Sequence, residues 1–220
     1  MLHAGGRGHG KENSLAAMRE GLTYRPDILE LDIRQSRDGV LFCYHGFNPV
    51  SFVAAYFLRF LRFSFIQKII RVNALTELIA EIPPTVITFL DIKDRHIPAK
   101  RIETACARHA GPVWLAAYSV PYLHSLRRQL GKRFTYVFNF SFLHLEKGIE
   151  AAAKAGTDII KLRAAQCRPE IIEKLGQQGL RFAIHPAGLT AKRYLQLLKE
   201  VGSAWVCVDD MRSKKVLRGL

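Results

Sequence analysis

The sequence predicts an α/β fold, a single (β/α)8 TIM barrel with parallel strands, a short first strand and an apolar insertion after strand three. Short apolar runs that suit strands alternate with helix-like runs along the chain, and the connections between them are short. About eight strands of this kind are enough to close a barrel. The 220 residues, of which 49% are hydrophobic, suffice for one core, so we expect one domain over residues 1–220.

The first half of the chain carries the opening strands of this barrel. They are expected over Met1-Leu2, residues 28–34, residues 40–44 and from residue 86 to Asp91. A turn at Asp38-Gly39 separates the second and third strands. The first helix is expected from a cap at Asn13 or Ser14 to near Pro26, and a helix over residues 74–80 leads into the fourth strand.

The second half repeats the alternation without a low-complexity linker. The expected helices span residues 99–109, 122–130, 145–155, 169–177 and 191–201. The expected strands span residues 113–118, 134–138, 158–162, 181–185 and 205–208. Strands that alternate with helices of this length are typical of parallel pairing through crossover connections.

Acidic residues lie on two of these apolar strands. Glu30 and Asp32 are two residues apart between aliphatic neighbours, so the period of a strand places both on one face. Asp91 and Lys93 repeat this spacing on a later strand. A buried carboxylate is costly unless it is paired, and one lysine cannot neutralise three carboxylates. The pattern indicates a hard divalent cation, although a plain Asp91–Lys93 ion pair or a strand that exposes its carboxylates would give the same spacing.

Two histidines follow apolar strands in the same part of the chain. His3 opens a glycine-rich run directly after the first strand, and His45 ends the run that begins at Val40. Parallel α/β barrels place their chemistry at the C-terminal ends of their strands. We therefore expect both histidines near the carboxylates. The alternatives are a solvated histidine near the terminus for His3 and a core histidine for His45.

Together these segments resemble one family, the glycerophosphodiester phosphodiesterases, which are barrels of the phospholipase C-like type. The matching segments, which agree in order and spacing, are His3, Glu12-Asn13-Ser14, Leu29 to Ile33, Asp38-Gly39, His45 and Leu90 to Lys93. They cover roughly the first hundred residues. Ala4 and Gly46 stand where the family commonly has an arginine and an aspartate. Asp91 stands where it commonly has a glutamate, which is similar to the related sphingomyelinase D branch.

The resemblance implies metal-dependent hydrolysis of glycerophosphodiesters to glycerol phosphate and an alcohol, a reaction of lipid metabolism. One divalent cation, Mg²⁺ or Ca²⁺, would be held by Glu30, Asp32 and Asp91. His3 and His45 would act as catalytic acid and base, since imidazole titrates near neutral pH. Two alternatives remain: a phospholipase D-like enzyme acting on a lysolipid or sphingolipid at a membrane, and a degenerate barrel that binds phosphate or membranes without turnover.

Four basic side chains are expected to bind the substrate. Lys93 would add a fixed positive charge beside the cation, and Arg7 would replace the arginine that is missing at Ala4. Lys161 and His185 end later strands, where the mouth of a barrel lies.

The apolar insertion spans residues 48–72. Between Pro49 and Ile70 it contains six aromatic residues, and its charges are Arg59, Arg62 and Lys68. The apolar run before Arg59 is too short to cross a membrane, which takes about 20 residues. The segment is expected either to pack on the barrel as helical turns or to lie at an anionic membrane surface beside the active site.

The formal net charge of +14 calls for anionic partners. A phosphate-bearing small molecule, a lysolipid or an anionic membrane would serve, whereas the basic residues are spread along the chain without a nucleic-acid motif, so no nucleic acid is expected. The four scattered cysteines suit buried thiols in a reducing compartment. No signal peptide is visible, so a cytoplasmic location is expected, with peripheral membrane contact as an alternative. The short first strand also allows that upstream residues, and a leader with them, are missing.

Overall fold

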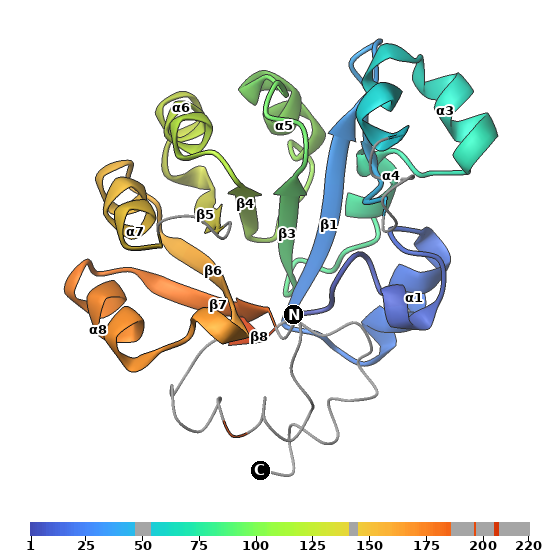
Figure 1. Cartoon of the computed structure of the whole chain (residues 1–220). Coiled ribbons are helices and arrows are strands. Elements are labelled where there is room, and N and C mark those ends of the chain that lie inside the picture. Colours follow the sequence, from blue (N-terminus) through green and yellow to red (C-terminus); the bar gives the residue numbers. More distant parts are fainter. Residues whose placement is uncertain (47–53, 141–144, 186–195, 197–204, 207–220) are drawn as a thin grey trace. The chain divides into compact units, whose positions relative to one another are not determined.

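The computed structural model describes residues 1–46, 54–140, 145–185, 196 and 205–206. The chain forms two compact units. The N-terminal unit is built on Leu2–Val113 and the C-terminal unit on Trp114–Val208. Each unit has its own strands and flanking helices (Figure 1). The single domain expected over residues 1–220 stays a prediction.

The central strand of the N-terminal unit is β1 (Ile28–Gln35), which lies between β2 (Leu41–Cys43) and β3 (Ile87–Ile92). β3 runs parallel to β1, with Asp91 opposite Asp32. β1 is buried along nearly its whole length, as strands are when both faces of a parallel sheet are covered. The acidic face of β1 is therefore as far from solvent as its aliphatic face.

β2 contradicts the prediction that all strands are parallel, because it pairs antiparallel with β1. The reason is the tight turn at Asp38-Gly39. A parallel neighbour needs a crossover of about a dozen residues, whereas an antiparallel neighbour needs only a turn. The chain therefore runs back along β1, and the Tyr44 amide donates to the Asp32 carbonyl oxygen at 2.9 Å. His45 is the next residue.

The first strand is as short as the sequence predicts. Leu2 forms one parallel bridge with Leu29. The Leu2 amide donates to the Ile28 carbonyl at 2.7 Å, and the Glu30 amide donates to the Leu2 carbonyl at 2.8 Å. This ladder carries His3 directly to the side of β1.

Short helices surround these strands. In the N-terminal unit they are η1 (Arg7–His9), α1 (Leu15–Thr23), η2 (Leu58–Phe60), α3 (Phe63–Ile70), α4 (Leu75–Ile79) and α5 (Ala99–Ala105). Ser14 caps α1, because its hydroxyl oxygen accepts a hydrogen bond from the Ala17 amide at 3.3 Å. η2, α3 and a helical turn over residues 54–57 make up the described part of the predicted insertion. Within the described residues, no helix is long and apolar enough to cross a membrane.

The C-terminal unit is a run of parallel strands in the order β4-β5-β6-β7-β8. The strands are β4 (Val113–Ala117), β5 (Thr135–Asn139), β6 (Ile159–Arg163), β7 (Arg181–His185) and β8 (Trp205–Val206). The helices are α6 (Val120–Leu130), η3 (Gly131–Arg133), α7 (Leu145–Lys154), η4 (Ala164–Gln166) and α8 (Pro169–Gln177). Figure 1 shows α6, α7 and α8 along the outer side of these strands. The predicted elements up to β7 are confirmed, while the predicted helix over residues 191–201 lies, apart from residue 196, outside the described residues.

Candidate active site

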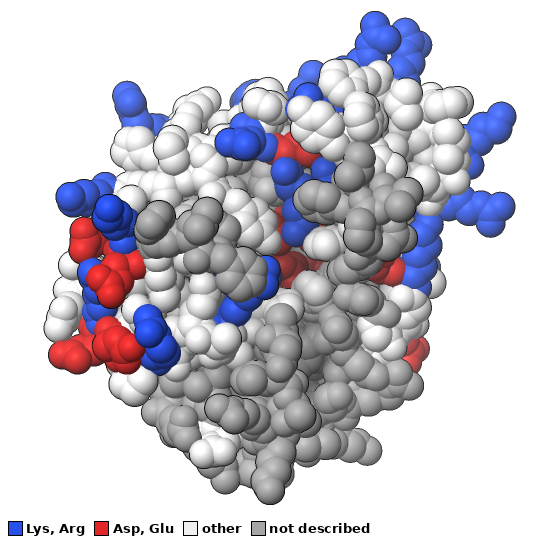
Figure 2. Space-filling view, viewed as in Figure 1, with Lys and Arg blue, Asp and Glu red and all other residues white. Residues whose placement is uncertain are grey.

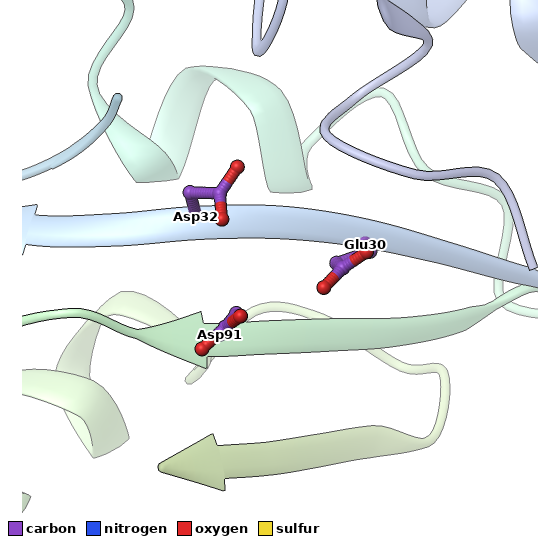
Figure 3. A group of neighbouring side chains, drawn as sticks. All are labelled: Glu30, Asp32 and Asp91. Carbon is purple, nitrogen blue, oxygen red and sulfur yellow. The ribbon is translucent and has the colours of Figure 1, made fainter. Parts of the chain in front are cut away.

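Three buried carboxylates converge in the N-terminal unit. Glu30 and Asp32 project from one face of β1, and Asp91 projects beside them from β3 (Figure 3). One carboxylate oxygen of each residue lies within 4.8 Å of those of the other two. Glu30 and Asp32 are fully buried, and Asp91 is 2% exposed. The cluster follows from the two-residue period of β1 together with the parallel register that sets Asp91 beside Asp32.

Lys93 is the cation nearest to this cluster among the described ion pairs. Its Nζ lies 2.9 Å from Asp32 Oδ1 and 2.7 Å from Asp91 Oδ2. Burial by itself would raise the pKa of Asp32, but the charge of Lys93, aided by the two histidines and a hydrogen bond from Asn13, holds this pKa below its usual range. Asp32 is therefore ionised at neutral pH.

The donor set fits a hard divalent cation. Carboxylate oxygens are the ligands that Mg²⁺ and Ca²⁺ prefer in proteins. Fully ionised, the three carboxylates carry three negative charges against the single positive charge of Lys93, and an uncompensated buried charge is costly. A divalent ion held by Glu30, Asp32 and Asp91 would balance the remainder.

His3 lies at the edge of the cluster, with its Nε2 3.6 Å from Glu30 Oε2. Backbone hydrogen bonds hold the turn that follows it. The Gly5 amide donates to the Glu30 carbonyl at 2.7 Å, and the Asn13 amide donates to the Ala4 carbonyl at 2.8 Å. The residue is 9% exposed. His3 is therefore fixed beside Glu30 rather than solvated.

A buried arginine holds the backbone that carries His45. Arg34 donates from Nε to the Tyr44 carbonyl at 3.1 Å and from Nη2 to the His45 carbonyl at 3.3 Å. Its Nη1 forms an ion pair with Asp94 Oδ1 at 3.0 Å. No local sequence pattern predicts this pair, although Arg34 shares the face of β1 that bears Asp32. Arg34 is a positioning residue for His45.

His45 is suited to accept a proton. Burial lowers its pKa, and the carboxylates of Asp32 and Asp91 offset this effect only in part. The imidazole is therefore neutral near pH 7. His3 and His45 both lower the pKa of Asp32 through their charge, so both imidazoles lie within electrostatic range of this carboxylate.

Asn13 orients that carboxylate. Its Nδ2 donates to Asp32 Oδ2 at 2.9 Å, and its Oδ1 accepts from the Asp32 amide at 3.1 Å. The sequence predicts Asn13 or Ser14 as a helix cap, and since Ser14 is the cap, Asn13 is available to hold Asp32. A polar residue just before a helix is expected to cap it, so the local sequence does not indicate that Asn13 binds Asp32. Glu12 lies nearby and accepts from the Gly46 amide at 3.4 Å.

The other predicted substrate contacts lie elsewhere in the chain. Arg7 belongs to η1, and its side chain is outside the described part of the structure. Lys161 on β6 is 9% exposed and lies opposite Asn139 of β5. His185 ends β7. Both of these residues belong to the C-terminal unit, and their contact with substrate stays a prediction.

The N-terminal segment matches a known family. The model of the glycerophosphoryl diester phosphodiesterase family matches residues 3–53. This range contains His3, Glu30, Asp32 and His45. No curated protein sequence matches the chain.

Solved structures resemble the chain over nearly its whole length. A glycerophosphodiester phosphodiesterase from Thermotoga maritima has 16% identity and a TM-score of 0.79, with 99% of this chain and 97% of that chain covered. One from Agrobacterium tumefaciens has 19% identity and a TM-score of 0.72, with 96% of each chain covered. An Oleispira antarctica phosphodiesterase in complex with the product sn-glycerol-3-phosphate has 13% identity and a TM-score of 0.77, with 100% and 96% covered. The predicted α/β barrel fold is thereby confirmed.

Proposed function

We propose that this chain is a member of the glycerophosphodiester phosphodiesterase family and hydrolyses glycerophosphodiesters to glycerol phosphate and an alcohol. The family model that matches residues 3–53 is that of the glycerophosphoryl diester phosphodiesterases, and this match supports a phosphoric diester hydrolase. The observation that carries the proposed reaction is the buried cluster of Glu30, Asp32 and Asp91, with Lys93 bound to two of them. The sn-glycerol-3-phosphate in the Oleispira antarctica phosphodiesterase supports a small phosphodiester as the substrate class.

The carboxylate cluster is proposed to bind one divalent cation, Mg²⁺ or Ca²⁺. When bound, such an ion would hold phosphate oxygens and neutralise charge that develops on them. Asn13 keeps the Asp32 carboxylate oriented through two hydrogen bonds. Lys93 keeps a positive charge at the same place. Arg7, Lys161 and His185 are proposed as further substrate contacts.

The two histidines are proposed to exchange protons with the substrate. We assign the base to His45, because burial keeps its imidazole neutral and able to take a proton from the attacking oxygen. This oxygen is that of water, or that of a substrate hydroxyl, in which case water opens the resulting cyclic phosphate in a second step. We assign the acid to His3, because an imidazolium there would pair with Glu30 at 3.6 Å. His3 would then protonate the leaving alkoxide. Arg34 holds the backbone of His45 in place during this exchange.

A second candidate function has its own supporting observation. Five large apolar side chains between Tyr56 and Ile69 are exposed in the segment that follows His45. Such a segment favours a phospholipase D-like enzyme that takes a lysolipid or sphingolipid from a membrane. Ala4 and Gly46, at positions where the family commonly has an arginine and an aspartate, leave the degenerate, non-catalytic barrel as a third candidate. The cytoplasmic location expected from the sequence stays a prediction.

One assay separates these candidates. Release of phosphate-bearing product is measured from glycerophosphocholine and from lysophosphatidylcholine, with Mg²⁺, with Ca²⁺ and with EDTA. Metal-dependent turnover of glycerophosphocholine supports the first candidate, and preference for lysophosphatidylcholine supports the second. No turnover of either substrate, with metal-dependent phosphate binding retained, would leave the non-catalytic barrel.

A further inference from the structure

We propose that the exposed face of the helical turn over residues 54–57, η2 and α3 docks the protein on an anionic lipid membrane. The face is called here the aromatic surface, and its apolar residues are Tyr56, Phe57, Phe60, Phe65 and Ile69. This proposal concerns where the protein binds, and it holds whether or not the carboxylate cluster hydrolyses a diester.

The aromatic surface concentrates the exposed apolar side chains of the described residues. Among the described residues, six large hydrophobic side chains are exposed. Five of them belong to the aromatic surface, and the sixth is Tyr118. The exposed fractions of the five range from 51% at Tyr56 and Phe65 to 59% at Ile69. Single exposed apolar residues are ordinary, whereas a contiguous group marks an interaction site.

These side chains are not needed to hold the segment on the protein, because a different set does so. The inward side chains Leu58, Leu61, Phe63, Ile66 and Ile70 pack with Phe42 and Val72. In α3, the inward Phe63, Ile66 and Ile70 follow helical spacing, and Phe65 and Ile69 lie on another face of the helix. The helix is thus apolar on two faces, and one of them has no partner among the described residues.

The charge of the segment identifies the partner. Between Gly39 and Thr76 the sequence has no Asp or Glu, and its basic residues are Arg59, Arg62, Lys68 and Arg71. The Arg59 guanidinium lies 3.9 Å from the ring centre of Tyr56 and 4.7 Å from that of Phe60. In Figure 2, Lys and Arg side chains fringe the pale surface of the region where Figure 1 places α3, at the upper right. Aromatic rings at the depth of the headgroups with basic side chains on lipid phosphates are the pattern of an interfacial segment.

The same charges argue against a second copy of this chain as the partner. A symmetric dimer through the aromatic surface would place Arg62, Lys68 and Arg71 near their own counterparts, with no acidic residue of the segment to offset them. α3 has eight residues, which is far short of the roughly 20 residues that cross a bilayer. The segment would therefore lie in the plane of the interface.

The aromatic surface is tied to the hairpin that carries the candidate base. The Arg37 amide donates to the Leu61 carbonyl at 2.8 Å, and the Phe63 amide donates to Asp38 Oδ1 at 2.9 Å. On its other side, Lys11 Nζ donates to the Arg71 carbonyl at 2.9 Å. Docking would thus hold the β1–β2 hairpin, and the His45 that follows it, in a fixed orientation to the membrane.

The test is vesicle binding in EDTA without substrate, so its outcome does not depend on catalysis. Vesicles of phosphatidylcholine with about one third phosphatidylglycerol are compared with phosphatidylcholine alone. The unaltered protein should sediment with the anionic vesicles and release as salt rises. The double variant Phe57→Ser/Phe60→Ser should lose binding by about tenfold or more, since each ring contributes buried apolar area. Tyr118→Ser, which removes an equally exposed aromatic outside the surface, is the matched control and should bind unchanged.

Charge is tested separately, with folding as a check. Arg62→Gln/Lys68→Gln should weaken binding to anionic vesicles severalfold and leave the melting temperature unchanged, which covers the case in which the phenylalanine variant does not fold. If the unaltered protein does not bind anionic vesicles, or if all variants bind alike, the proposal is overturned. If the protein instead forms a dimer that the phenylalanine variant abolishes, a second copy covers the surface and the membrane reading is wrong.

Discussion

Two regions of the molecule depart from the usual pattern in which charged side chains are exposed and large apolar side chains are buried. They are the pair of strands β1 and β3 and the aromatic surface. The strands bury three carboxylates within 4.8 Å of one another, whereas the aromatic surface leaves Phe57 and Phe60 more than half exposed. Both arrangements are poor for stability taken alone. They differ in compensation: the carboxylates are bound by Lys93, Asn13 and His3, and the aromatic rings have one stacked arginine. The first region is the candidate metal site, and the second is the surface that we propose docks on a membrane.

The largest expected effect comes from removing a carboxylate of the cluster. Asp32→Asn should abolish metal-dependent activity. It should also abolish the rise in melting temperature that we expect Mg²⁺ or Ca²⁺ to cause in the unaltered protein. At a hundredfold excess of metal over Kd, binding adds about 2.7 kcal/mol to the free energy of unfolding. Differential scanning calorimetry with and without metal checks the second effect. Asp27→Asn, which changes an exposed carboxylate just before β1, should retain both. If the melting temperature of the unaltered protein does not change in millimolar metal, the carboxylate cluster does not bind a metal ion.

Removal of either candidate catalytic histidine is expected to give the second-largest effect. His45→Ala and His3→Ala should each lower kcat by about 10²–10⁴-fold, because general acid and base catalysis typically contributes that much. The metal-induced rise in melting temperature should persist in both variants. His124→Ala, at an exposed position on α6, should leave kcat unchanged. A loss of metal binding in His45→Ala would mean that the histidine supports the cluster instead of the reaction.

The two faces of α3 give a third, smaller effect. Ile66→Ala on the inward face should lower the free energy of unfolding by about 2–5 kcal/mol, because Ile66 is fully buried. Phe65→Ser on the outward face should change it by no more than about 0.5 kcal/mol. Urea unfolding of the two variants checks the contrast. Equal destabilisation would show that the outward face of α3 is also packed in solution. It would contradict the proposal that this face is a docking surface.

The smallest expected effect is a dependence of stability on pH. Burial holds the pKa of His45 below its ordinary value of 6.5, so the folded protein favours the neutral imidazole. The contribution of the neutral His45 imidazole to the free energy of unfolding is complete above the pKa of the unfolded state. It is lost as pH falls through the lower pKa of the folded state. Stability should therefore decrease below about pH 6.5, and less steeply in His45→Gln. The acid limb of the pH–rate profile should also lie below that pH, and a limb above it would contradict the assignment of His45 as the base.

Much of the fold is visible in the sequence because apolar periodicity reports it directly. The two-residue period of β1 predicts which residues face the cluster, and Asp91 follows from the same reasoning on β3. β2 is predicted with the wrong direction, because alternation of strands and helices implies parallel neighbours and the short turn at Asp38-Gly39 is the one local signal against it. His45 nevertheless reaches the carboxylates, since the antiparallel return brings the chain back along β1.

The parts of the site that the sequence does not reveal depend on contacts between distant residues. Asn13 looks like a helix cap, and its bonds to Asp32 appear only when the loop is folded against β1. Arg34 and Asp94 are sixty residues apart, and no local pattern pairs them. The period of β1 could have singled out Arg34, which shares a face with Glu30 and Asp32.

The β1–β2 hairpin makes the chemistry unusually local along the chain. Two carboxylates of the cluster, the arginine that holds the backbone of His45, and His45, the proposed base, come from one stretch between Glu30 and His45 that contains a single turn. Contacts of such short sequence separation form early and cheaply during folding. The same locality concentrates risk, because strand pairing has a period of two and one inserted residue in the turn would send every following side chain to the opposite face. A change of length in the turn at Asp38-Gly39 is thus expected to displace His45 from the carboxylate cluster, although neither residue of the turn belongs to that cluster.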